Sequence, residues 1–176
     1  TATWKIIAST TVMMSTDYPA GRPINLGQWD GFSDERRLIL EAMLSDRIEN
    51  VIVISGDLHT FLAGQVTTTG RADGKPVALE FCGGAISSFG LFDLLPSDRS
   101  LAARFATTAS SANPHWSFVD LLTRGYAVVE ARPDELLVTL RGVETTFEPQ
   151  SDVFDVAVFR VAKGSKVIET ISTAPV

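Results

Sequence analysis

Apolar residues recur along the first third of the chain in two spacings, one typical of buried strands and one typical of a helix. Trp4–Met14 and Val51–Ser55 are apolar on both faces, as strands covered on both sides are. Between them, Ser33 is a good N-cap residue followed by two acids, so we expect a helix that ends near Arg47. The helical spacing predicts an inner face made of Ile39, Ala42 and Met43, with Leu38 beside them.

The second half of the chain alternates between apolar and polar residues, which is typical of antiparallel strands. We expect strands at Ala63–Thr69, Val77–Phe81, Tyr126–Ala131, Glu135–Val143 and Val153–Val161. Tyr18–Gly31 is rich in turn residues and is predicted to be a loop, Leu91–Ser111 to be partly helical, and Trp116–Thr123 to be a short helix. The pattern therefore predicts one mixed α and β domain around one or two sheets.

Composition excludes several classes of protein. The 176 residues carry a net charge of −6, with a pI near 4.9, which argues against binding to nucleic acid or to an anionic membrane surface. No apolar run approaches the roughly 18 residues that a transmembrane helix needs. A single cysteine, Cys82, can form no internal disulfide, and one Cys with two His rules out a zinc ribbon. Because the chain opens inside an apolar run without Met, we expect further residues upstream of Thr1.

The strand Val51–Ser55 ends abruptly in the sequence Gly-Asp-Leu-His, which contains one of only two histidines in the chain. Side chains at strand ends gather in the crevice of an open α/β sheet. In extended geometry, Asp57 and His59 would lie on the same face of the chain. A carboxylate and an imidazole placed together suit a hard or borderline metal ion. The alternative is that Asp57 caps a turn and His59 is an ordinary loop histidine; spacing alone leaves both open.

The stretch Gln28–Phe32 contains two further candidates. Trp29 and Asp30 are predicted to bind substrate; the alternative is a loop held by a buried tryptophan and phenylalanine, in which Asp30 accepts hydrogen bonds from backbone N–H groups.

The second histidine belongs to the stretch Asn113-Pro114-His115-Trp116. Asn113 and His115 are candidate catalytic residues and Trp116 is a candidate substrate-binding residue; for Asn113, the alternative is a helix cap. The small residues of Gly83–Ser88 are expected to serve core packing, because neither a P-loop lysine nor a G-x-S-x-G elbow is present.

The phrase GDLH after an apolar strand resembles the GDxH block of metallophosphoesterases. Five blocks resemble, in order, the C-terminal part of the PhoD-like family, which includes alkaline phosphatases and phospholipases of the D type. The resemblance runs from Ala2 to about Glu130. The blocks are ATWKIIASTTVMM, GQWDGFSDERRLIL, NVIVISGDLHTFLAGQV, LEFCGGAISS and NPHWSFVDLLTRGYAVVE.

The resemblance implies an α/β fold, the layered α-β-β-α sandwich of metallophosphoesterases. Residues 1–176 would be the C-terminal part of a single catalytic domain, completed by an upstream chain segment. Asp57 and His59 fall on the family's metal ligands, in a binuclear site that the resemblance assigns to iron with calcium. The family's other ligands lie upstream, and Cys82 lies in the wrong block to be one of them. The resemblance also implies secretion, and an upstream fragment of the same precursor as the natural partner.

Three hypotheses for the function follow. The first is a metal-dependent phosphodiesterase of the phospholipase D type, in which a metal-bound hydroxide releases phosphatidate and a head-group alcohol. The second is an alkaline phosphomonoesterase on the same scaffold, and the third is a non-catalytic β-rich accessory domain. The apolar residues of Phe89–Ser111 favour a lipid substrate, although ordinary core packing explains them equally well.

Overall fold

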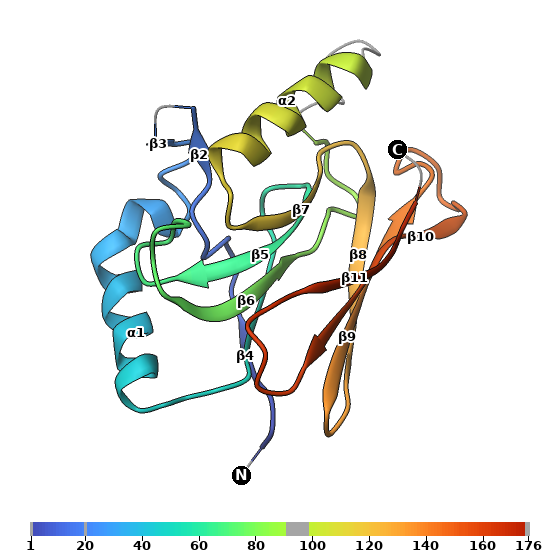
Figure 1. Ribbon diagram of the computed structural model, residues 1–176. Coiled ribbons are helices and arrows are strands. Elements are labelled where there is room, and N and C mark those ends of the chain that lie inside the picture. The colour runs from blue at the N-terminus through green and yellow to red at the C-terminus, as the bar shows by residue number, and fades with distance from the viewer. Residues whose placement is uncertain (1, 20, 91–98, 175–176) are drawn as a thin grey trace.

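The computed structural model describes residues 2–19, 21–90 and 99–174, which form two sheets, with helices on the side of the first sheet (Figure 1). The first sheet has the order β1-β4-β6-β5-β7 and the second the order β11-β10-β9-β8, while β2 and β3 form a small hairpin. The first-sheet strands are β1 (Lys5–Ala8), β4 (Val51–Ser55), β5 (Phe61–Thr67), β6 (Pro76–Cys82) and β7 (Trp116–Asp120). The others are β2 (Asp17–Tyr18), β3 (Arg22–Pro23), β8 (Arg124–Ala131), β9 (Glu135–Val143), β10 (Val153–Ala162) and β11 (Glu169–Thr173). The helices are the 3-10 turn η1 (Trp29–Phe32), α1 (Ser33–Ser45) and α2 (Arg99–Ala112).

Two apolar cores lie on the two faces of the first sheet. One core fills the space between the sheets, where alternate residues of β9 such as Leu136, Val138 and Leu140 pack with Phe81 of β6. The other lies between the first sheet and α1, where Leu40 packs with residues of β4, β5 and β6 and with Val12–Met14. The described residues thus form three layers in the order helix, sheet, sheet.

The fold class is confirmed as mixed α and β with sheets predominating. The outer face of the second sheet is open in the described part of the chain, where Tyr126, Val128 and Phe154 are more than a third exposed. The fourth, helical layer of the expected sandwich therefore stays a prediction. No described helix is long and apolar enough to cross a membrane.

The prediction of one buried strand over Trp4–Met14 is wrong. Only Lys5–Ala8 is a strand, and it lies at the edge of the first sheet, paired with β4 in parallel. Residues Val12–Met14 are buried without strand pairing, because side chains bind their backbone groups instead. By contrast, β4 has neighbours on both edges and is buried as predicted.

The helix after Ser33 is confirmed, but of its predicted inner face only Met43 turns inward. Leu38 is 60% and Ile39 38% exposed, and Ala42 also faces outward. The residues that turn inward are Arg36, Leu40, Met43 and Leu44. The buried face includes Arg36 because that guanidinium pairs with the carboxylate of Asp30 below the helix, which hydrophobic periodicity does not reveal.

The predicted short helix at Trp116–Thr123 is also wrong. Trp116–Asp120 is strand β7, antiparallel to β5. Backbone pairing with a neighbour distant in sequence overrode the local pattern. The remaining predicted strands are present with bounds shifted by a few residues, and the partly helical stretch Leu91–Ser111 contains α2, although residues 91–98 lie outside the described residues.

Candidate functional site

The loop after β4 holds Asp57 and His59 in an uncommon backbone conformation. Their φ angles are 73° and 54°, in the left-handed region that non-glycine residues rarely adopt. The expectation of extended geometry is therefore wrong, although both residues do follow the strand end. Two such residues within three positions cost on the order of 1–3 kcal/mol each, and strain of this kind is concentrated at functional sites.

The carboxylate of Asp57 is oriented by a buried amide. Gln28 Nε2 donates to Asp57 Oδ2 at 2.6 Å, while Gln28 Oε1 accepts the backbone N–H of Val12 at 2.6 Å. Gln28 is only 1% exposed, so both ends of its amide are fixed. One carboxylate oxygen of Asp57 is thereby held, and the side chain itself is exposed and able to bind a cation.

The imidazole of His59 is oriented by a backbone carbonyl. Its Nδ1 lies 2.6 Å from the carbonyl oxygen of Phe89. Because a carbonyl only accepts hydrogen bonds, Nδ1 carries the proton and Nε2 of the neutral ring carries the lone pair. A metal-binding histidine is held in the same way, since its second nitrogen donates to an oxygen outside the metal's own ligands.

Asp57 and His59 fit a metal ion as a partial set of ligands. An oriented carboxylate and an oriented imidazole are ligand types of many metal sites. Within residues 2–19, 21–90 and 99–174, however, no three His, Cys, Asp or Glu side chains gather closely enough to hold an ion. Cys82 is buried in the core, where burial raises the pKa of its thiol to about 12.

All the other predicted site residues except Trp29 place their side chains against one segment, Val12–Asp17. Asp30 accepts hydrogen bonds from Ser15 Oγ and from the backbone N–H of Thr16, both at 2.8 Å. His115 Nε2 and Trp116 Nε1 both donate to the carbonyl of Ser15, at 2.8 and 3.1 Å. These side chains fix the segment at Ser15 and Thr16.

Asn113 completes this set of contacts and is fully buried. Its Oδ1 accepts the backbone N–H of Asp17 at 2.9 Å, and its Nδ2 donates to the carbonyls of Asp17 and Ala109 at 2.9 and 2.8 Å. The amide thus has a backbone partner on every side. His115 is 4% exposed, and burial lowers the pKa of its imidazole, which favours the neutral ring.

Asp30 is also the partner of a buried cation. Its Oδ1 lies 3.0 Å from Arg36 Nη1, and both side chains are at most 3% exposed. Removal of one member of a buried ion pair leaves the other charge without compensation, which typically costs about 3–5 kcal/mol. The position of Asp30 therefore supports the interpretation of a loop held by this carboxylate.

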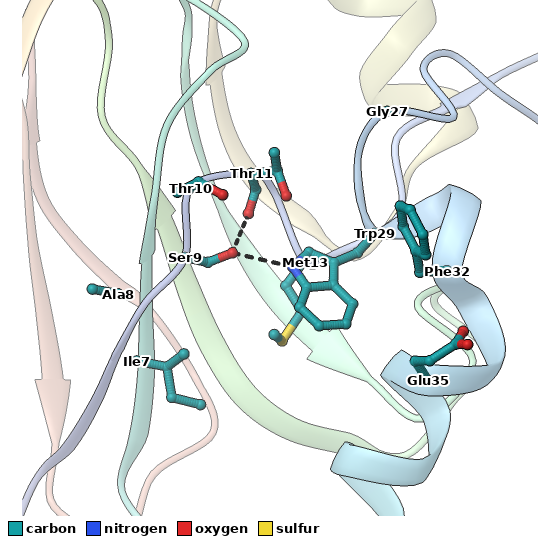
Figure 2. Close-up of a pocket in the computed structure, with 10 residues that line it drawn as sticks. All are labelled: Ile7, Ala8, Ser9, Thr10, Thr11, Met13, Gly27, Trp29, Phe32 and Glu35. Atoms are coloured by element: carbon teal, nitrogen blue, oxygen red, sulfur yellow. Dashed lines mark hydrogen bonds between the residues drawn. The ribbon is translucent and has the colours of Figure 1, made fainter.

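Trp29 lies in a different cavity from His59 and Trp116. Figure 2 shows Trp29 beside Phe32 and Met13. The open cavity that these residues line, next to β1, has a volume of about 580 Å³. Its indole Nε1 donates to Ser9 Oγ at 3.1 Å. No described residue lines both this cavity and the one that contains His59.

Two supporting residues were missed by the sequence analysis. Glu80 is fully buried in β6, and its two oxygens accept the backbone N–H groups of Met13 and Met14 at 2.8 and 2.6 Å. An acid inside the apolar run VALEFC was the available signal. Gln28 gave no comparable signal, because its two partners are distant in sequence.

The chain is similar to known proteins in sequence and in fold. The family model of PhoD-like phosphatases matches residues 1–140. Alkaline phosphatase D of Bacillus subtilis (strain 168) is 24% identical over 181 residues, which cover the whole of this chain. A solved structure, "Structure of PhoD", superposes with a TM-score of 0.79 at 20% identity over 99% of this chain.

The chain spans only part of these relatives, 29% of the curated protein and 33% of the chain in the solved structure. The matched region nonetheless includes the strand-end pair Asp57 and His59 and the supporting residues around Val12–Asp17. Since the family model covers most of the chain, this protein belongs to the PhoD-like phosphatase family.

Proposed function

We propose that this chain supplies part of the active site of a metal-dependent phosphoric ester hydrolase. The observation that carries the proposal is the pair of oriented side chains after β4. Asp57 is held by Gln28, and His59 is held by the carbonyl of Phe89 with Nε2 left to accept a ligand. Family membership gives this pair its chemical context.

The proposed role of this chain is to bind metal ions and to orient the side chains that bind them. Asp57 and His59 would bind the metal ions, for which the resemblance favours iron with calcium. Two obstacles oppose the hydrolysis of a phosphoester, namely its negative charge and the high pKa of water. Bound cations would neutralise the charge and lower the pKa of bound water. The segment Val12–Asp17 forms a rigid support beside the pair, because Asn113, His115 and Trp116 fix its backbone. We therefore assign these three side chains a positioning role.

The proposal includes a contribution from residues outside this chain. Two ligands do not complete a binuclear site, so we infer that an upstream segment of the same precursor brings the others and completes a single catalytic domain. Relatives about three times as long are consistent with this inference. Secretion of the protein is part of the same proposal.

A diester of the phospholipid type is the proposed substrate, and an alkaline phosphomonoesterase is the second candidate. The apolar segment Phe89–Ser111 favours the diesterase because His59 is tied to its first residue. The name of the curated relative, an alkaline phosphatase, favours the monoesterase. A diesterase should hydrolyse phosphatidylcholine faster than an aryl phosphate monoester, and a monoesterase should show the opposite preference.

The test is to replace the pair in the intact protein. Asp57→Asn and His59→Ala should each lower turnover by at least about 10²-fold, the size of effect expected when charge stabilisation in a site is lost. Iron and calcium content, measured by elemental analysis, should fall while circular dichroism stays unchanged. Asp134→Asn, in an exposed turn, is the matched control. Normal turnover and full metal content in His59→Ala would refute the assignment.

A further inference from the structure

A smaller cavity of about 100 Å³ lies beside His59, apart from the cavity of Figure 2. Its walls come from the β2–β3 hairpin region, the loop after β4, and α2. Apolar side chains predominate in the lining, among them Ile24, Leu58, Ala109 and Trp116. His59 is the one imidazole in this wall, so the cavity adjoins the candidate metal-binding pair.

Three of the polar groups in the wall are engaged with partners away from the cavity, while the imidazole of His59 and the phenol of Tyr18 also belong to the lining. Trp116 Nε1 donates to the carbonyl of Ser15, Thr60 Oγ1 to the carbonyl of Asp120, and Thr16 Oγ1 to Asp30. The described lining residues include no carboxylate. The described wall is therefore mainly aliphatic and aromatic, and it carries no negative charge.

The size of the cavity limits what it can hold. An engineered apolar cavity of about 150 Å³ binds benzene. A cavity of about 100 Å³ therefore admits a branched or short alkyl group of about four carbons. Each methylene group that it removes from water should strengthen binding by about fourfold.

We propose that this cavity is a subsite for the apolar end of the alcohol in the phosphoester. The inference rests on the proposed function, because it places the phosphate at Asp57 and His59 and the alkyl group behind them. The preferred substrates are then esters of neutral, branched or short-chain alcohols. A quaternary ammonium alcohol of the same shape should bind less well, because the lining offers no carboxylate to balance its charge.

Two alcohols of matched shape test the subsite without any catalysis. 3,3-Dimethyl-1-butanol and choline differ in that a neutral carbon replaces the ammonium nitrogen. In NMR titrations of the intact protein, the neutral alcohol should shift the signals of the Trp116 indole and the Ala109 methyl group. Choline should bind at least about tenfold more weakly. Equal or tighter binding of choline would overturn the proposal in favour of an aromatic cation site.

Variants of the wall supply the control. Ala109→Leu fills the cavity and should weaken binding of the neutral alcohol by at least about tenfold. Ala103→Leu makes the same change on an exposed position of α2 outside this cavity and should leave binding unchanged. Ile24→Ala removes three carbons from the wall and should shift the best-bound alcohol to a longer one. Undiminished binding in a folded Ala109→Leu protein would refute the subsite.

Hydrolysis assays separate this inference from the proposed function. Ala109→Leu should lower kcat/KM for 3,3-dimethylbutyl phosphoesters and leave that for methyl phosphoesters unchanged. If the alcohols bind as described but no phosphoester is hydrolysed, the function is wrong and the apolar binding site stands. If phosphoesters are hydrolysed with no dependence on the alcohol or on Ala109, the function stands and the subsite is wrong.

Discussion

At the scale of single residues, the orientation of Asp57 depends on the buried amide of Gln28. Gln28→Glu keeps an acceptor for the N–H of Val12 but places a second carboxylate against Asp57. The two acids repel each other, and the donor that orients Asp57 is lost. We expect metal affinity to fall by about 10–100-fold, the range typical of losing a partner that orients a ligand. Calorimetric metal titration of the intact protein measures this change.

Gln65→Glu is the matched control for this prediction. Gln65 Nε2 also donates to an oxygen, the carbonyl of Lys166, but Gln65 lies in β5 away from the strand-end pair. This variant should lose stability to a similar degree and keep its metal affinity. If both variants bind metal like the original protein, Gln28 has no role in orienting Asp57.

Sequence reasoning found the two residues of the strand-end pair but not the residues that hold them. The motif GDLH left two interpretations of Asp57 and His59 open, and only the family resemblance assigned them to a metal site, which stays a prediction. The partners of this pair, Gln28 and the carbonyl of Phe89, lie 29 and 30 positions away along the chain. Contacts across such separations depend on the tertiary fold and leave no local pattern.

At the scale of elements, strand β6 fixes the segment Val12–Asp17 through Glu80. Burial raises the pKa of this carboxyl to about 7, against an ordinary value of 4.5. The folded protein thus holds the proton more tightly than the unfolded chain. The resulting stability is fully present below pH 4.5 and is lost as the pH rises through 7. A shift of this size corresponds to a loss on the order of 3 kcal/mol.

Glu80→Gln tests the assignment, because glutamine does not titrate. Denaturant unfolding of the intact protein and of the variant should be compared at several pH values between 4.5 and 7.5. The free energy of unfolding of the original protein should fall by about 3 kcal/mol more than that of the variant. If the free energies of unfolding of the two proteins change in parallel over this pH range, a group other than Glu80 is responsible for the pH dependence.

The close approach of β5 and β7 makes a second prediction for elements. A Cβ on Gly64 would lie 2.6 Å from the carbonyl oxygen of His115 and 3.0 Å from Cα of Trp116. Backbone cannot move aside as a flexible side chain can. Gly64→Ala should therefore destabilise the protein by about 1–3 kcal/mol, as overpacking does.

Gly83→Ala is the control for Gly64→Ala, because its added Cβ would meet only ordinary contacts at 3.7 Å or more. Thermal unfolding of the two variants should show a much larger loss for Gly64. Equal melting temperatures of the two variants would mean that β5 and β7 can move apart to accommodate the added Cβ without loss of stability.

The two mispredicted elements have physical reasons of the same kind. Trp116–Asp120 is a strand because β5 offers it a ladder of backbone hydrogen bonds, and that partner lies more than 50 positions earlier. Val12–Met14 is irregular because Gln28 and Glu80 take the hydrogen bonds that a neighbouring strand would have taken. In both cases, the competing partner lies far along the chain. The strands β8 to β10, joined in sequence, were predicted correctly because each pairs with the next.

At the scale of the whole molecule, the described part of the chain has an open side at β1. This edge strand pairs only with β4, and its Ile6 is 50% exposed. The open cavity of Figure 2 adjoins it, and Phe32, which lines that cavity, is 55% exposed. An apolar edge of this kind invites pairing with another strand. Relatives about three times as long have further chain that could cover it.

The last prediction is that the proposed upstream segment covers this edge. Ile6→Lys should disturb the intact protein, because a charge would be buried at the contact, and should cost at least about 2–3 kcal/mol. Ile171→Lys makes the same change on β11, the edge strand of the second sheet, where Ile171 is 54% exposed. This control should leave the free energy of unfolding nearly unchanged.

In residues 1–176 produced alone, Ile6→Lys should instead improve solubility and reduce binding of a dye that detects apolar surface. The measurements are unfolding free energies for the intact variants, with solubility and dye fluorescence for the isolated chain. Equal tolerance of both lysines in the intact protein, or an isolated chain that is soluble, unfolds cooperatively and holds iron unaided, would contradict the shared domain.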